Sequence, residues 1–78
     1  MRIEVKLPRY GANMDEGTIA GWLKQPGDAV AVGEGLCEIE TEKVTAVYES
    51  PVAGVLVEIK VPAGDVLEVG GVLCVIDT

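Results

Sequence analysis

Several residue types that support catalysis or nucleic-acid binding are scarce in this sequence. It has no histidine and no phenylalanine, and six Lys and Arg residues stand against thirteen Asp and Glu residues. Histidine is the commonest general base and the commonest metal ligand, and the chain has no Cys-x-x-Cys motif or clustered-carboxylate site. The net charge of −7 disfavours a nucleic-acid partner, because phosphate binding needs clustered Lys and Arg. We therefore expect no catalytic residue, no metal site and no nucleic-acid partner.

Long apolar segments are also missing. No apolar run approaches the roughly 18 residues of a membrane span, and the N-terminal MRIEVKLPRYG lacks the apolar block of a signal peptide. The two cysteines do not suggest a disulfide-dense secreted scaffold. These features predict a protein without a membrane partner and with reduced thiols, in the cytosol or an organelle matrix.

The residues that are present favour β-structure. Val is the dominant apolar type, and ten glycines lie between short apolar segments. β-branched side chains fit a pleated sheet, and Gly fits the turns between short strands. A chain of this length has room for one core, so residues 1–78 are predicted to form one all-β domain.

An internal repeat refines this prediction. GTIAGWLKQPGDAVAVGEGLCEIET (17–41) aligns without gaps with GVLVEIKVPAGDVLEVGGVLCVIDT (54–78), at an offset of 37 residues, and nine of 25 positions are identical. Neither half can bury its apolar face alone. The repeat therefore predicts two small antiparallel sheets, packed as a flattened β-barrel or sandwich with pseudo-two-fold symmetry.

The repeat also predicts the roles of individual residues. Gly27 and Gly64, in the two Gly-Asp turns, should adopt backbone conformations that are costly for other residues. Cys37 and Cys74 occupy matching places and should point inward as small hydrophobic side chains, with a redox or disulfide role as the alternative. The predicted core consists of Ile3, Val5, Ile19, Trp22, Val30, Leu36, Ile39, Val55, Ile59, Val69, Leu73 and Ile76.

One lysine has a distinctive place beside the repeat. Lys43 lies alone among the acids of EIETEKVTAVYE, between two β-rich segments that only about two residues separate. We expect a hairpin with a type I turn, because the Asn-Gly or Asp-Gly of the primed turns is missing. The symmetry puts the chain termini in the equivalent place of the other half. Lys43 should therefore be exposed at the end of the domain opposite the termini, although an exposed turn lysine is also an ordinary solvated residue.

Motifs spread over the whole chain add to this interpretation. LPRYGANMDEGTIAGWLKQPGDAVAVGEGLCEIETEKV contains Pro-x-x-Gly-x-x-Met-x-Glu-Gly, Trp-x-x-x-x-Gly-Asp and Glu-x-Glu-Thr-Glu-Lys, and SPVAG contains Ser-Pro-x-x-Gly. Together these patterns resemble the biotinyl/lipoyl domain family, specifically the lipoyl domains of the acyltransferase (E2) component of 2-oxo acid dehydrogenase complexes. The resemblance implies that Lys43 carries lipoate in an amide bond, as a swinging arm that shuttles acyl groups and reducing equivalents between active sites.

The resemblance also implies recognition residues and partners. Glu40 and Gly54 match family positions used by the lipoylating enzyme, although each also has an ordinary structural interpretation. Glu42 and Val44 flank the lysine, and residues 11–17 match a surface loop that helps the decarboxylase recognise its substrate. The implied partners are the lipoylating enzyme, the 2-oxo acid decarboxylase (E1), the acyltransferase core (E2) and dihydrolipoamide dehydrogenase (E3), with the isolated domain a monomer. With this resemblance, the expected compartment becomes the bacterial cytoplasm or the mitochondrial matrix.

Two alternative functions and two further questions stay open at the level of sequence. Biotin carboxyl carrier domains typically have Met on both sides of the lysine, where this chain has Glu42 and Val44. A lipoyl-like structural adaptor would leave Lys43 unmodified. The lipoyl pattern more often reads Asp-Lys-Ala, and Glu42 and Val44 depart from it toward variants seen in branched-chain and acetoin-type complexes. The identity of the 2-oxo acid, or an acetoin-type complex in its place, is therefore open. Whether the chain is free-standing or part of a longer E2 is open as well.

Overall fold

The computed structural model describes residues 1–9, 14–42 and 44–78. These residues form eight short strands, and the described part of the chain offers no helix that could span a membrane. In chain order the strands are β1 (Arg2–Lys6), β2 (Glu16–Trp22), β3 (Ala29–Val30), β4 (Gly35–Glu40), β5 (Thr45–Glu49), β6 (Gly54–Ile59), β7 (Val66–Glu68) and β8 (Val72–Asp77).

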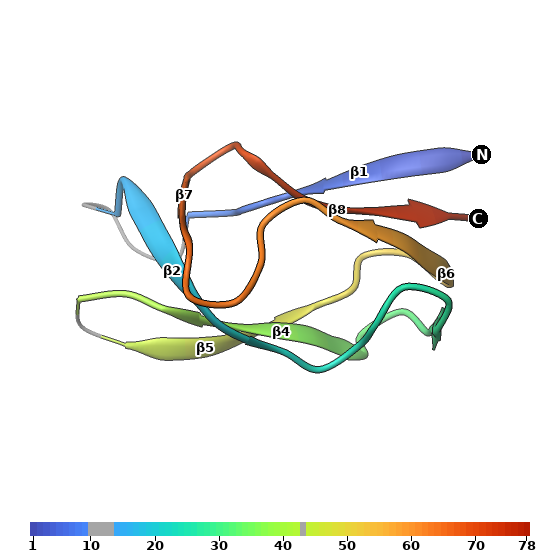
Figure 1. The fold of residues 1–78 in the computed structure, drawn as a ribbon, viewed down its shortest axis with the longest axis horizontal. Helices are drawn as coiled ribbons and strands as arrows, with labels where there is room; N and C mark the ends of the chain where they lie inside the picture. The colour runs from blue at the N-terminus through green and yellow to red at the C-terminus, as the bar shows by residue number, and fades with distance from the viewer. Residues whose placement is uncertain (10–13, 43) are drawn as a thin grey trace.

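The strands build two four-stranded antiparallel sheets that face each other (Figure 1). One sheet has the order β1-β8-β6-β3 and the other the order β5-β4-β2-β7. The principal extents of 32, 20 and 18 Å describe a flattened, elongated sandwich. The predicted all-β architecture is confirmed.

The pseudo-two-fold symmetry is visible in the strand pairing. The pairs β2–β4, β2–β7 and β4–β5 of one sheet correspond to β6–β8, β6–β3 and β8–β1 of the other. Single hydrogen bonds repeat as well: the Gly27 amide donates to the Leu56 carbonyl at 2.7 Å, and the Gly64 amide donates to the Ile19 carbonyl at 2.6 Å. Each half thus closes its turn on a strand of the other half.

The two Gly-Asp turns have the predicted backbone. Gly27 has φ of 98° and Gly64 has φ of 94°, values that L side chains rarely adopt. In the first turn the Gln25 amide also donates to Oδ2 of Asp28 at 2.9 Å. This carboxylate satisfies a backbone donor that would otherwise face solvent at the turn.

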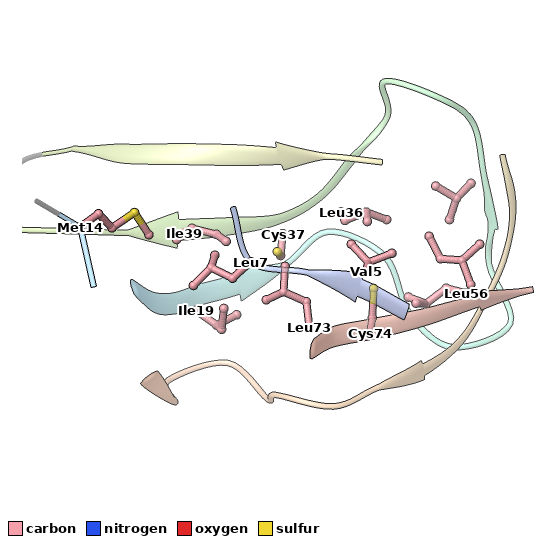
Figure 2. Packing of buried hydrophobic residues seen from close by; sticks show 12 residues of the cluster. Val5, Leu7, Met14, Ile19, Leu36, Cys37, Ile39, Leu56, Leu73 and Cys74 are labelled. Carbon is pink, nitrogen blue, oxygen red and sulfur yellow. The ribbon is translucent and has the colours of Figure 1, made fainter. Parts of the chain in front are cut away.

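The core lies between the sheets and runs along the long axis of the sandwich (Figure 2). Both cysteines point inward, as predicted, and are fully buried. The buried cluster consists of Val5, Leu7, Met14, Ile19, Val30, Leu36, Cys37, Ile39, Leu56, Leu73, Cys74 and Ile76. Trp22, Ile59 and Val69 are partly buried and pack against it, and Ile3 is also half-buried.

The core prediction is wrong at Val55, which is 40% exposed, while its neighbour Leu56 is fully buried. A strict alternation that starts from Ile59 selects Val55. The pairing of β6 with β8 has an irregularity between Leu56 and Glu58, however, and Leu56 lies opposite Ile76. Such a bulge adds one residue and reverses the inward phase along the strand. The repeat alignment already matched Leu56 with Ile19, and it would have predicted the correct residue.

Candidate functional site

The strands that flank Lys43 form a regular antiparallel hairpin. β4 and β5 are paired up to Glu40 and Thr45. Beyond this pair the Thr41 amide donates to the Val44 carbonyl at 2.8 Å. The Thr41 hydroxyl donates to the same carbonyl at 2.9 Å and accepts a bond from the Val44 amide at 3.2 Å. Thr41 therefore links β4 to β5 beyond the last residue pair of the two strands. Only residues 42 and 43 lie between Thr41 and Val44 in the sequence.

Lys43 itself lies outside the described residues, so its predicted exposure stays a prediction. Its two neighbours are described: Glu42 is exposed and Val44 is 53% exposed. Glu42 does not have a positive φ, which excludes turn types I′ and II′ with Glu42 at the first central position. The type I turn remains a prediction, because it also depends on the conformation of Lys43.

The hairpin and the chain termini lie at opposite ends of the sandwich (Figure 1). At the terminal end the Thr78 amide donates to the Met1 carbonyl at 2.8 Å, and the Thr78 hydroxyl donates to it at 3.2 Å. These two bonds repeat two of the three that join Thr41 and Val44 at the other end. The prediction that the termini occupy the symmetry-related place of the hairpin is therefore confirmed for its described residues.

The structure separates the four predicted recognition residues into two groups. Glu40 is exposed at the end of β4, close in the chain to Glu42 and Val44. Gly54 begins β6, whose next residue pairs with Asp77 beside the chain termini, so Gly54 lies at the end away from the hairpin. A Cβ atom on Gly54 would overlap the carbonyl oxygen of Asp77. The geometry gives Gly54 a packing role.

The described end of the segment 11–17 is anchored near the hairpin. Met14 is 9% exposed, and in Figure 2 its side chain lies at the same end of the core as Ile39 of β4. A Cβ atom on Gly17 would lie 2.9 Å from Cγ2 of Ile39 and 3.3 Å from Cε of Met14. The sequence-based core missed Met14, although it is the one large apolar side chain in GANMDEG.

The charged residues that the structure describes in the β4–β5 hairpin, over residues 35–42 and 44–49, are all acids. Glu40 and Glu42 are exposed and Glu38 is half-buried, whereas the exposed Glu49 lies opposite Gly35, at the end of the β4–β5 pair away from the turn. None of these acids forms an ion pair within the described ranges. The Lys24 ammonium is 2.9 Å from Glu34, and this contact lowers the pKa of the Glu34 carboxyl. The hairpin therefore presents an acidic surface to solvent.

The two cysteines do not offer a second reactive site. Both thiols are free and fully buried. Burial raises the pKa of Cys37 to about 12, with a further contribution from Cys74, and burial raises the pKa of Cys74 to about 11. Since the thiolate is the nucleophile and the metal ligand, both groups are inert near neutral pH. The described residues also contain no group of His, Cys, Asp or Glu side chains that could hold a metal ion.

Comparison with known proteins adds the family. The family model described as "Biotin-requiring enzyme", which covers biotin and lipoyl domains, matches residues 3–76. The chain belongs to the biotin/lipoyl domain family. A solved structure with the same fold is the lipoyl domain of the 2-oxoglutarate dehydrogenase complex from Azotobacter vinelandii. It has a TM-score of 0.79 and 34% identity, over 97% of this chain and 96% of that chain.

Curated relatives of this biotin/lipoyl domain are much longer proteins. The dihydrolipoyllysine-residue acetyltransferase component of the pyruvate dehydrogenase complex of Corynebacterium glutamicum is 47% identical over 97% of this chain. The dihydrolipoyllysine-residue succinyltransferase component of the 2-oxoglutarate dehydrogenase complex of Staphylococcus saprophyticus is 48% identical over 94% of it. The chain spans 11% and 17% of the lengths of these two relatives.

Proposed function

We propose that Lys43 carries lipoate in an amide bond and that this domain is the lipoyl carrier of a 2-oxo acid dehydrogenase complex. The observation that carries the proposal is the β4–β5 hairpin, whose described residues Glu42 and Val44 are exposed at the end of the sandwich opposite the termini. The 34% identity to a lipoyl domain over almost the full length of both chains supports the choice of cofactor.

The residues fit this group chemically. Lys43 supplies a primary amine between two exposed neighbours. In the attachment step Nζ of Lys43 forms a bond to the carbonyl carbon of an activated lipoyl donor of the acyl-phosphate anhydride class. The bond from that carbon to the phosphate oxygen breaks, and the amine proton passes to solvent. The attached group would supply an accessible disulfide that accepts an acyl group and two electrons, whereas Cys37 and Cys74 are free, buried thiols.

The body of the domain suits a carrier. A carrier has to hold a bound intermediate near several active sites, and a tether then replaces free diffusion by a high effective concentration. The longest axis of the sandwich measures 32 Å. A tether attached at the terminal end would therefore be separated from the hairpin by the whole length of the domain. The acidic surface formed by Glu38, Glu40 and Glu42 would guide the hairpin end of the domain to basic rims on partner enzymes.

The partners and the compartment follow from the proposed carrier role. The partners are the lipoylating enzyme, the decarboxylase E1, the acyltransferase core E2 and the dehydrogenase E3. The named relatives come from bacteria, and one from Schizosaccharomyces pombe is described as mitochondrial, which supports the bacterial cytoplasm or the mitochondrial matrix. Glu40, Glu42 and Val44 are proposed to be read by the lipoylating enzyme. Gly54 contributes to that recognition only through the packing of β6 on β8.

Biotin is the second candidate cofactor, because the matching family model carries the description "Biotin-requiring enzyme". Glu42 and Val44 stand where biotin carriers typically have Met, and this difference favours lipoate. An unmodified structural adaptor is the third.

Intact mass tests all three. The 78-residue chain is incubated with a lipoylating enzyme, lipoate and ATP, and in parallel with a biotinylating enzyme, biotin and ATP. We expect one lipoyl addition, which is lost in Lys43→Arg, because a guanidinium keeps the charge but is not acylated. We expect little biotin on the natural chain and more after both flanking residues are changed to Met. Efficient biotinylation without lipoylation would favour the carboxyl carrier, and no addition of either group would favour the adaptor.

A further inference from the structure

The three hydrogen bonds between Thr41 and Val44 have a consequence for the modification of Lys43. The Thr41 amide and hydroxyl both donate to the Val44 carbonyl, at 2.8 and 2.9 Å, and the hydroxyl accepts from the Val44 amide at 3.2 Å. One side chain thereby satisfies both backbone groups of the residue that follows Lys43. We propose that Thr41 is a positioning residue for lipoylation, acting through Val44 on the segment that contains Lys43. This inference rests on the proposed function.

The pseudo-symmetry separates this role from a purely structural one. Thr78 makes two of the three corresponding contacts to Met1, a backbone bond of 2.8 Å and a hydroxyl bond of 3.2 Å, at the end away from the hairpin. The Met1 amine donates to the Thr78 carbonyl at 3.0 Å and to Oδ1 of Asp77 at 3.1 Å. Both threonines are therefore part of the same repeated structural motif. Only Thr41 is followed by the Glu42–Lys43 segment. Thr78 is a matched position whose hydroxyl binds Met1 at the end of the sandwich away from the β4–β5 hairpin.

The rate of enzymatic lipoylation should depend on the Thr41 hydroxyl, whereas the rate of acylation by a small reagent should not. Enzymatic transfer requires the lysine amine and its flanking backbone to fit one active site in one geometry. If Thr41 and Val44 are already held in place, less conformational entropy is lost when the enzyme binds the segment between them. A soluble active ester needs only an accessible, deprotonated amine. Loss of the hydroxyl should slow enzymatic transfer and leave chemical acylation unchanged.

The experiment compares Thr41→Val, Thr41→Ser and Thr78→Val with the natural chain. Valine has the shape of threonine without its hydroxyl, and serine keeps the hydroxyl. Each variant competes with ¹⁵N-labelled natural chain for a limiting amount of lipoylating enzyme, and mass spectrometry gives the ratio of kcat/KM. We expect about a tenfold loss for Thr41→Val, the factor that one or two net hydrogen bonds imply, and changes below about twofold for Thr41→Ser and Thr78→Val.

Two further measurements do not depend on the enzyme. Acylation of Lys43 by the active ester, read from the modified peptide, should be equal in all four chains. Hydrogen exchange at the Val44 amide should be about tenfold faster in Thr41→Val alone, because that amide loses its acceptor. Thr41→Ala serves as a second variant without the hydroxyl if the valine variant does not fold.

The outcomes separate the two hypotheses. Lipoylation of Thr41→Val at the natural rate overturns the inference while the proposed function stands. An equal loss in Thr78→Val overturns it as well, because the effect would then be a general change in stability. If the natural chain takes no lipoate, the proposed function fails, and an unchanged Val44 exchange rate in Thr41→Val would independently refute the hydrogen-bonding role of Thr41.

Discussion

Replacing Gly54 with alanine tests whether sheet packing requires a glycine at a position that the family resemblance links to enzyme recognition. A Cβ atom there would overlap the carbonyl oxygen of Asp77, and it would lie 2.9 Å from Cγ2 of Ile76 and 3.0 Å from the carbonyl carbon of Asp77. The two Asp77 atoms are backbone atoms of β8, which is paired on both sides, with β1 and with β6. The strand therefore cannot yield without breaking hydrogen bonds, whereas a flexible side chain could turn away.

The expected cost lies in the upper part of the range for overpacking, about 2–3 kcal/mol. For a domain of this size each kcal/mol lowers Tm by about 4–8 °C, so Gly54→Ala should lower it by roughly 8–24 °C. Gly21→Ala is the matched control, because Gly21 lies in β2 without a positive φ and has no atom within 4 Å of its Cβ position. We expect this control to be neutral or up to about 1 kcal/mol more stable, since alanine restricts the unfolded chain.

Urea unfolding followed by Trp22 fluorescence measures both variants, because the indole is partly buried and donates to the Val61 carbonyl at 2.8 Å. Circular dichroism provides the second probe of a two-state transition. Lipoylation is then measured at a temperature where both variants remain folded. A loss below about 0.5 kcal/mol for Gly54→Ala, or an equal loss for Gly21→Ala, would refute the packing argument. Normal stability with slow lipoylation would instead support direct recognition of Gly54.

Two further predictions concern the turns and the thiols. Gly27→Val and Gly64→Val should each destabilise the domain by about 1–3 kcal/mol in urea unfolding, because φ near +95° is strained for valine, and an unchanged midpoint in both would contradict the turn assignment. Burial raises the pKa of Cys37 from 9.0 to about 12 and of Cys74 from 9.0 to about 11. Their neutral forms therefore stabilise the fold fully below pH 9, and this contribution is lost as the pH rises from 9 through 11 for Cys74 and through 12 for Cys37. The free energy of unfolding should decline over that range less steeply when both cysteines are replaced by alanine, and equal slopes would show that other groups cause the decline.

The repeat explains why so much of the fold could be predicted. Two copies of one pattern, each with an apolar face it cannot bury alone, permit few arrangements other than face-to-face packing of two sheets. The same alignment predicted the inward direction of Cys37 and Cys74 and the special backbone of Gly27 and Gly64. These features depend on local periodicity and on turn chemistry, which a sequence expresses directly.

The errors and omissions have a common physical origin in strand register. Val55 was predicted to be buried because strict alternation was continued through β6, but the bulge between Leu56 and Glu58 reverses the phase. A bulge depends on the partner strand, so alternation within one segment does not reveal it. Met14 was missed for a related reason, since a residue in an irregular segment has no periodicity that marks it as buried.

For the candidate site, the sequence by itself determined which residue could carry a lipoyl group. Lys43 is the one lysine between the two β-rich segments, and it ends the motif Glu-x-Glu-Thr-Glu-Lys of the biotin/lipoyl family. The tertiary structure decided which neighbours act with it. It separated Gly54 from the hairpin by pairing β6 with β8 beside the termini, and it joined the Thr41 hydroxyl to Val44 across the turn. Residue identity and spacing are properties of the chain, whereas proximity between strands is set by register and sheet packing, which arise only when the two halves fold onto each other.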